Sequence, residues 1–343
     1  MTSAGSGRFW LQGTGRPLAE IYDVALLDLD GVVYLGRQRI DGVPESLAAA
    51  RARGMRLAFV TNNASRSTDM VAAHLVEIGV PARRDDVVTS SQAAAHLIAD
   101  RLGPGAAVLV VGSPALRDVV IAEGLRPVDS ADDRPDAVVQ GFWSELCYTD
   151  LAEAALAVRA GALWVATNAD STLPSPRGLL PGNGSLVGVV RAAAGVAPIV
   201  AGKPELPLHA EGVRRTGAKR PLVVGDRLDT DIEGANAADT PSLLVLTGVT
   251  SATDLVSVAA KYRPTYVAAE LSALLEAQPE VEVEGLVGRC EKAEIAVRDG
   301  AFSVEAAGTP IDALRALLAL AWTMSDRGEP IADASVALAT LGI

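Results

Sequence analysis

The chain has 343 residues, 49% of them hydrophobic and 21% charged, which is enough for two or three packed domains. Its formal net charge of −12 disfavours nucleic acids and anionic membranes as partners, because both would be repelled. Two cysteines make no disulfide framework, and no apolar stretch provides the roughly 20 residues of a membrane span or the core of a signal peptide. We therefore expect a cytoplasmic protein without a nucleic-acid or membrane partner.

The first part of the chain alternates apolar runs with helical patterns. Strands are predicted over 23–29, which ends in acidic residues, and over 56–60. Helices are predicted over 44–53, where Gly54 stands at the C-cap position, and over 67–78. Parallel strands need crossover connections of this length, so the spacing favours a parallel sheet with helices on both faces.

The same alternation returns late in the chain. Helices are predicted over 206–216 and near 232–237, and strands over 221–224 and 242–246. The segment between the two halves has strand patterns of its own, at 107–111, 137–140 and 163–167, and a Pro- and Gly-rich exit linker at 173–184. The fold class expected is α/β: a doubly wound parallel core formed by 1–87 and 184–262, with an inserted α/β cap over 88–183.

The tail has a different pattern. Two β-like runs, 281–287 and 294–297, precede an amphipathic helix over 311–325. Its apolar stripe has helical spacing and is expected to face a core; it comprises Leu314, Leu317, Leu318, Ala321 and Trp322. This predicts a small α+β module over 263–343. Dimerisation, regulation and packing remain open as its role, so a homodimer is one open alternative.

Two acids close the first predicted strand, in Asp28-Leu29-Asp30-Gly31. Side chains two residues apart in an extended chain point to the same side, so Asp28 and Asp30 can act on one group. One carboxylate can attack phosphorus as a nucleophile while the other protonates the leaving oxygen. Taken alone, the tetrapeptide also fits a solvated turn at a strand end.

Anion-binding groups are predicted at two further positions of the sheet. The second strand ends in Thr61-Asn62-Asn63, a hydroxyl followed by backbone N–H groups that suit a phosphate, although an N-cap and an Asx turn would have the same residues. Lys203 is expected to begin the helix that follows, where its ammonium and the helix dipole both favour an anion. An isolated lysine is otherwise most often a surface residue.

A third strand ends in Gly225-Asp226, and Asp231 follows in the next helix. Magnesium is usually held by one or two carboxylates together with water and substrate phosphate oxygens. Asp28, Asp226 and a supporting Asp231 would therefore suffice for Mg²⁺, whereas Asp229 is expected to be solvated. An acid-rich helix start is the simpler alternative.

All of these signals fall at strand ends or helix starts of one predicted sheet. In their order, Asp-x-Asp-Gly, Thr-Asn-Asn, Gly-Lys-Pro and Gly-Asp-x-x-x-x-Asp, the sequence resembles the haloacid dehalogenase-like phosphatase superfamily. The long insertion before Lys203 resembles the type IIA subgroup, which includes p-nitrophenylphosphatase, phosphoglycolate phosphatase and glycerol-3-phosphate phosphatase. The resemblance covers roughly residues 20–250, including Asn168-Ala169-Asp170 and Pro181-Gly182-Asn183-Gly184-Ser185, and leaves the tail outside.

The resemblance implies a phospho-aspartate mechanism. Asp28 would be the nucleophile and a metal ligand, and Asp30 the general acid and then base, with its backbone carbonyl on the metal. Asp226, with Asp231 in support, would complete the Mg²⁺ site. Substrate and phosphate binding would fall to a second set of residues: Thr61, Asn62, Asn63, Lys203 and Asp170.

The expected substrate is a small phosphorylated metabolite. The side chains of the cap loop near Asp170 are small and mostly polar, and none is aromatic, so the loop has no platform on which a substrate ring could stack. We therefore expect glycerol 3-phosphate first, then 2-phosphoglycolate or another sugar or polyol phosphate. A phosphotransferase that uses the same aspartate, and a non-catalytic binding protein, remain the alternatives.

Overall fold

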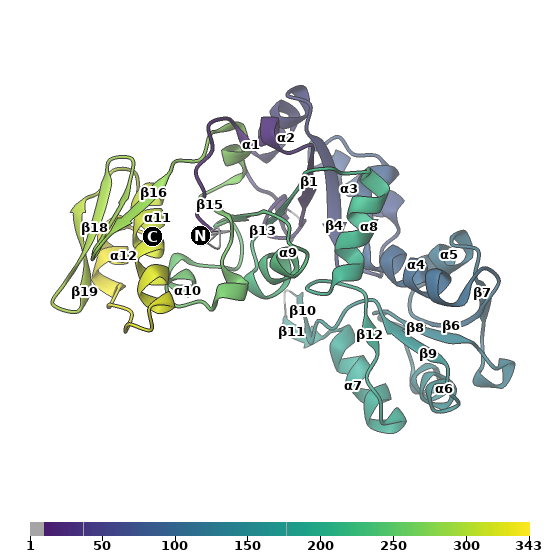
Figure 1. Ribbon diagram of the computed structural model, residues 1–343. Coiled ribbons are helices and arrows are strands. Elements are labelled where there is room, and N and C mark those ends of the chain that lie inside the picture. Colours follow the sequence, from purple (N-terminus) through teal and green to yellow (C-terminus); the bar gives the residue numbers. More distant parts are fainter. Residues whose placement is uncertain (1–9, 37, 176) are drawn as a thin grey trace, which may run out of the picture. The chain divides into compact units, whose positions relative to one another are not determined.

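The computed structural model describes residues 10–36, 38–175 and 177–343 (Figure 1). The chain separates into two compact units. The first comprises the residues up to Leu57 together with Ala218–Ile343, and the second is Ala58–Gly217. Within the described ranges, no helix combines the length and hydropathy needed to cross a bilayer.

Parallel strands form the centre of the first unit, in the order β15, β14, β13, β1. Their bounds are β1 (Val24–Leu27), β13 (Pro221–Gly225), β14 (Ser242–Val245) and β15 (Tyr266–Ala268). All their residues except Pro221 are buried, which explains why these strands appear in the sequence as unbroken apolar runs. Parallel strands place their carboxyl ends at one edge of the sheet, where Asp28 follows β1 and Asp226 follows β13.

Short helices and a hairpin connect these strands. The hairpin is β2 (Tyr34–Leu35) and β3 (Gln38–Arg39). The connecting helices are α2 (Val43–Ala52), α9 (Glu233–Ala237) and α10 (Ala252–Val256), and α1 (Leu18–Ile21) precedes β1. A π-helical turn, Leu228–Ile232, precedes α9 and carries Asp231. The helices expected over 44–53 and 232–237 therefore form, within one residue at each end.

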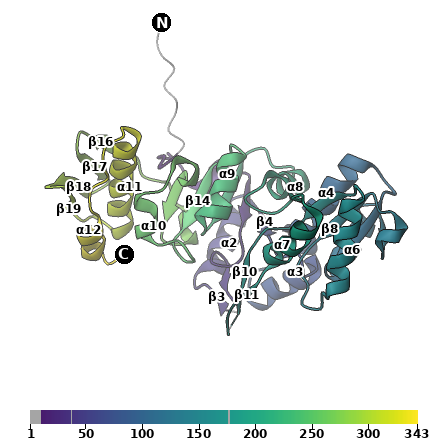
Figure 2. The same cartoon turned by 90° about the horizontal axis from the view of Figure 1, so that it is seen from below.

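The tail folds as an antiparallel sheet against one long helix (Figure 2). Its elements are β16 (Val281–Glu284), β17 (Val287–Cys290), β18 (Ala293–Arg298), β19 (Ala301–Ala306), α11 (Pro310–Asp326) and α12 (Ser335–Leu341). The chain reverses at Gly285, whose φ is +62°, so the run expected over 281–287 is divided between β16 and β17.

Helix α11 is buried on nearly every side, from Ala313 to Met324. The apolar stripe that the sequence assigns to a core does lie in one. Arg315, which is also buried, connects the helix to the parallel sheet: its Nε donates to the Val267 carbonyl at 3.0 Å and its Nη2 to Gln278 Oε1 at 2.9 Å. The indole of Trp322 donates to the Leu255 carbonyl at 2.8 Å. The tail thus packs against the parallel sheet of the first unit.

The second unit contains its own parallel sheet, in the order β12, β9, β8, β6, β7. The strands are β6 (Ala107–Val111), β7 (Arg126–Val128), β8 (Ala137–Gln140), β9 (Leu163–Ala166) and β12 (Ile199–Val200). Figure 1 shows α4 (Ser90–Leu102) and α5 (Pro114–Ala122) on one face, and α6 (Tyr148–Arg159) and α7 (Asn183–Ala194) on the other. The expected strands at 107–111, 137–140 and 163–167 are all present.

The remaining elements of this unit include two further parallel strands, the end of β4 (Arg56–Thr61) and β5 (Val87–Thr89), that pair with each other outside that sheet. They also include the helices α3 (Thr68–Glu77) and α8 (Leu206–Thr216). The expected linker at 173–184 contains a hairpin of β10 (Thr172–Ser175) and β11 (Gly178–Pro181). Lys203 lies in the turn before α8 and not in the helix itself.

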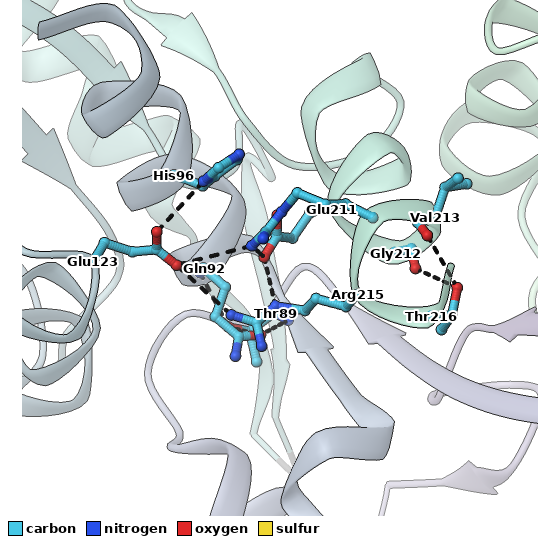
Figure 3. A network of polar contacts seen from close by, with 10 residues as sticks. Thr89, Gln92, His96, Glu123, Glu211, Gly212, Val213, Arg215 and Thr216 are labelled. Atoms are coloured by element: carbon cyan, nitrogen blue, oxygen red, sulfur yellow. Dashed lines mark hydrogen bonds and ion pairs between the residues drawn. The ribbon is translucent and has the colours of Figure 1, made fainter. Parts of the chain in front are cut away.

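A buried carboxylate organises one face of α8. Glu211 is 2% exposed and accepts hydrogen bonds from Arg214 and Arg215, one turn further along the helix. Figure 3 shows this group beside Glu123, which follows α5 and also contacts His96 of α4 at 3.4 Å. Burial alone would raise the pKa of Glu211, but hydrogen bonds and charges from the two arginines lower it below its ordinary value.

We expect Glu211→Gln to lower the free energy of unfolding by about 1–3 kcal/mol, because it removes the buried negative charge and replaces one of the two acceptor oxygens that face the arginines with an NH2 donor. Glu145→Gln, the same change at an exposed residue of this unit, serves as the control and should stay within about 0.5 kcal/mol. Urea titrations at neutral pH measure both.

The difference between Glu211→Gln and the unaltered protein should also depend on pH. Because the folded pKa is lowered, the charged carboxylate stabilises the fold above its ordinary pKa of 4.5, and this contribution is lost as pH falls further. The difference should therefore be largest near neutrality and shrink below about pH 4. A difference that stayed constant across this range would contradict the ion-pair account.

Candidate active site

Three carboxylates meet at the carboxyl edge of the parallel sheet in the first unit. Asp28, Asp226 and Asp231 each offer an oxygen, and these oxygens all lie within 4.8 Å of one another. Asp226 and Asp231 are buried and Asp28 is half-buried. Like charges this close repel strongly in a partly dry site, and oxygen-only donors are the ligands that Mg²⁺ prefers. The donor set therefore fits a hard divalent cation.

The backbone of two glycines approaches the Asp226 carboxylate closely. A Cβ on Gly31 would lie 2.3 Å from Asp226 Oδ2, and one on Gly248 would lie 2.0 Å from the same atom. Gly31 also has a φ of +90°, a conformation that other residues rarely adopt. Both positions therefore require glycine, so that the backbone can approach the carboxylate from two sides.

Hydrogen bonds from the loop 246–250 hold Asp226 and Gly31 in place. The Val249 N–H donates to Asp226 Oδ2 at 2.7 Å, and the Thr250 N–H donates to the Asp226 carbonyl at 3.2 Å. The Thr247 hydroxyl donates to the Gly31 carbonyl at 2.6 Å, joining this loop to the turn that follows Asp28. Sequence reasoning assigned no role to this loop, although it directly follows β14.

The other acids of the region differ in environment. Asp30 is exposed, and its Oδ1 accepts a hydrogen bond from the Gly36 N–H at 3.1 Å. Asp231 Oδ2 accepts from the Arg227 N–H at 3.2 Å, which orients it toward the cluster. Asp229 is exposed and paired with the Arg227 side chain at 2.8 Å, in keeping with the expectation that it is solvated and outside the cluster. Asp30 is thus accessible to a reactant.

A second polar cluster lies within the second unit. Asn62 is its centre: its Oδ1 accepts from the Lys203 N–H at 2.8 Å, and its Nδ2 donates to the Lys203 carbonyl at 3.2 Å and to Asp170 Oδ2 at 3.4 Å. Thr61 Oγ1 accepts from the Asn63 N–H at 3.1 Å. The structure therefore brings together the residues predicted to bind substrate and phosphate.

The Asn62 side chain makes a contact that sequence analysis did not predict. Both of its polar atoms hold the backbone of Lys203, so its amide positions that residue. A Cβ on Gly202 would lie 2.6 Å from Asn62 Oδ1, which shows how closely the two segments approach. Only tertiary contacts reveal this role, since Asn62 and Lys203 are far apart in the chain.

The loop that carries Asp170 is held from two directions. Asn168 Nδ2 donates to the Asn62 carbonyl at 2.8 Å, and Asn168 Oδ1 accepts from the Asp170 N–H at 3.2 Å. From the start of α7, Asn183 Nδ2 donates to the Asn168 carbonyl at 2.8 Å and the Gly184 N–H to the Asp170 carbonyl at 2.9 Å. Sequence analysis included Asn168 and Asn183 among the motifs of the resemblance but gave neither a function; Asn183 is the first residue of α7.

Comparison with known protein families supports this arrangement of motifs. Residues 25–126 match the haloacid dehalogenase-like hydrolase family, and residues 200–274 match a HAD-hydrolase-like family. The first match begins in β1, just before Asp28, and the second includes Lys203, Asp226 and Asp231.

Curated relatives include phosphatases of small metabolites. The D-glycerol 3-phosphate phosphatase of Mycobacterium tuberculosis is 58% identical over 259 residues, which cover 76% of this chain and 72% of that protein. An acid sugar phosphatase of Staphylococcus saprophyticus is 35% identical and matches 74% of this chain and 97% of its own length.

Solved structures extend the similarity. A crystal structure of glycerol phosphate phosphatase from M. tuberculosis in complex with magnesium has a TM-score of 0.84 and 51% identity, covering 92% of this chain and 94% of the other. The p-nitrophenyl phosphatase from Archaeoglobus fulgidus has a TM-score of 0.69 and 27% identity over 74% of this chain and 98% of the other.

These solved structures confirm the predicted fold class. Because 92% of the chain is covered, the similarity also includes most of the tail, which lay outside the resemblance noted from the sequence. Identity of 58% across three quarters of the chain is far above what unrelated sequences share. The chain belongs to the haloacid dehalogenase-like hydrolases.

Proposed function

We propose that this protein is a Mg²⁺-dependent phosphatase of small phosphomonoesters, with glycerol 3-phosphate as its preferred substrate. The carboxylate cluster at the ends of β1 and β13 carries the proposal. The relative at 58% identity, a D-glycerol 3-phosphate phosphatase, supports this choice of substrate. 2-Phosphoglycolate and other sugar or polyol phosphates are the alternatives.

Asp28 would act as the nucleophile. One carboxylate oxygen attacks the phosphorus in line with the ester oxygen, an O–P bond forms on Asp28, and the ester P–O bond breaks with its electron pair on the departing alkoxide. The Asp28 N–H donates to the Val224 carbonyl at 2.8 Å, so the residue continues the ladder between β1 and β13. Its carboxylate therefore starts from a rigid strand end.

Asp30 would supply and then remove protons. It protonates the alkoxide as the ester bond breaks, and its carboxylate then takes a proton from the water that attacks the acyl phosphate. That attack regenerates Asp28 and releases inorganic phosphate. The exposure of Asp30 suits this role, because the group must meet both the leaving oxygen and water.

The protein ligands for Mg²⁺ would be the Asp28, Asp226 and Asp231 carboxylates and the backbone carbonyl of Asp30. When bound, the cation supplies electrostatic neutralisation between the nucleophile and the phosphate. Loop 246–250 would keep the Asp226 carboxylate oriented, through the Val249 N–H and through Thr247 on Gly31.

We further propose that the Asn62 cluster of the second unit serves the same phosphoryl group. This assignment follows the order of the family's motifs: Thr61 and the backbone near Asn62 and Asn63 would bind phosphate oxygens, and Lys203 would neutralise them. Asp170 would accept a hydrogen bond from a substrate hydroxyl.

Three further expectations from the sequence remain predictions. They are the division into core, cap and tail module, the homodimer as one alternative for the role of the tail, and the cytoplasmic location.

A substrate panel tests the function. With Mg²⁺ present, purified protein should release phosphate from glycerol 3-phosphate faster than from 2-phosphoglycolate, pyridoxal phosphate or nucleotides. Asp28→Asn should lose at least roughly 10³-fold in kcat while keeping its circular dichroism spectrum and melting temperature, since the amide has nearly the shape of the carboxylate but is a much weaker nucleophile. Equal release of glycerol and phosphate separates hydrolysis from phosphotransfer. Substantial turnover by Asp28→Asn would refute the mechanism.

Leaving-group dependence tests Asp30. Asp30→Asn should lower kcat/KM for glycerol 3-phosphate by about 10²–10⁴-fold, because its alkoxide needs a proton. The loss should be much smaller for p-nitrophenyl phosphate, whose phenolate leaves unprotonated. The measurement is kcat/KM for both esters, since this ratio reports the first phosphoryl transfer. Equal losses on the two esters would exclude Asp30 as the general acid.

Thr247 provides a test of the metal site. Thr247→Val keeps the shape of the side chain but removes the 2.6 Å hydrogen bond to Gly31, so Mg²⁺ affinity should fall by about tenfold. Calorimetric titration of Mg²⁺ into the protein without substrate measures this directly. Thr247→Ser retains the hydroxyl and should bind Mg²⁺ as the unaltered protein does. Unchanged affinity in Thr247→Val would show that the loop does not support the site.

A further inference from the structure

The start of α7 makes several hydrogen bonds and close contacts with the loop that carries Asp170. The Gly182 N–H donates to the Ser171 carbonyl at 2.9 Å, and the Ser185 hydroxyl donates to the same carbonyl at 2.7 Å. A Cβ on Gly182 would lie 2.3 Å from the Asp170 carbonyl oxygen. We call the segment Gly182–Ser185 the α7 clamp; it fixes the backbone on both sides of the Asp170 side chain.

Asn183 is the buried member of this clamp. It is 2% exposed, and its Nδ2 donates to the Asn168 carbonyl at 2.8 Å and to the Gln140 carbonyl at 3.4 Å. It thus joins the Asp170 loop to the end of β8, in the middle of the second unit's sheet. Because the strand is rigid, a hydrogen bond to its end restricts the movement of the loop.

From Asn183 the hydrogen bonds continue through two more asparagines. Asn183 holds the Asn168 carbonyl, the Asn168 side chain holds the Asn62 carbonyl, and the Asn62 side chain holds the backbone of Lys203. Asn168 is 5% exposed. All links lie within the second unit, and they end on the two charged residues, Asp170 and Lys203, that we assign to the substrate.

This buried polar cluster is poorly explained by stability alone. Asn183 Oδ1, the Thr167 hydroxyl and both polar atoms of the Gln140 side chain make no hydrogen bond among the described residues. Gln140 and Thr167 are fully buried. Unsatisfied buried polar atoms destabilise a fold, so the orphaned Asn183 Oδ1 carries a cost that opposes the gain from the two bonds that Nδ2 donates. The position therefore favours a functional explanation for the amide.

We propose that Asn183 is a positioning residue: through Asn168 and Asn62 it sets the placement of Asp170 relative to Lys203, and so the fit of the substrate. The proposal rests on the proposed phosphatase function. Among the described residues, the Asn183 side chain donates to Asn168 and Gln140, neither of which we assign to the substrate or the metal. Small errors in the placement of binding groups can lower rates by up to about 10²-fold, so a buried amide outside the reacting site can matter.

Substitution of Asn183 tests the proposal. Asn183→Ala removes both donated hydrogen bonds, and Asn183→Leu removes them while retaining most of the volume. Both should raise KM for glycerol 3-phosphate about tenfold and lower kcat/KM by more, whereas the Mg²⁺ concentration for half-maximal rate should stay within about twofold. Val189→Ala, at an exposed residue of α7, is the matched control and should change neither constant.

A second measurement does not depend on turnover. In hydrogen exchange, the amides of Asp170, Gly182 and Gly184 should exchange at least about tenfold faster in both Asn183 variants, because the loop loses its link to β8. A lower melting temperature with unchanged KM and unchanged exchange would reduce Asn183 to a packing residue and overturn the proposal. Failure of the unaltered protein to hydrolyse any phosphomonoester would overturn the function, and with it the substrate role of the clamp.

Discussion

Electrostatic repulsion among three aspartates is the constraint on which the rest of the structure depends. Oxygens of Asp28, Asp226 and Asp231 lie within 4.8 Å of one another, two of the residues buried, in a chain that already carries a net charge of −12. Such a cluster is unfavourable by itself and becomes favourable once a divalent cation binds. The parallel sheet supplies the rigidity that keeps the carboxylates together, and Gly31 and Gly248 supply the space.

The second unit shows the complementary chemistry. Its polar cluster is built mainly from amides and backbone groups, which join Asn62 to the backbone of Lys203 and to the Asp170 carboxylate. Neutral asparagines can position charged neighbours without adding further charge to an acidic protein. The carboxylates of the first unit and the amides of the second thus form two polar clusters of different charge.

Much of the fold could be predicted from sequence because its strands are buried on both faces and appear as unbroken apolar runs. Asp28 and Asp226 were predictable for the same reason, since each directly follows such a run. The hairpin at Thr172–Pro181 was not, because β11 is exposed along its whole length and shows no alternation. Nor were the roles of Thr247, Asn168 and Asn183, whose partners are distant backbone carbonyls that leave no local pattern.

The tail helix has a thermodynamic consequence for the whole first unit. Arg315 caps the Val267 carbonyl of β15 and Trp322 caps the Leu255 carbonyl, so the last fifth of the chain shares hydrogen bonds and an apolar interior with the sheet that bears the aspartates. Segments joined in this way stabilise one another, so a weakened tail also weakens the sheet. Substitutions in the tail would therefore change the fraction of folded molecules that can bind the metal. They would do so although no tail residue belongs to the aspartate cluster.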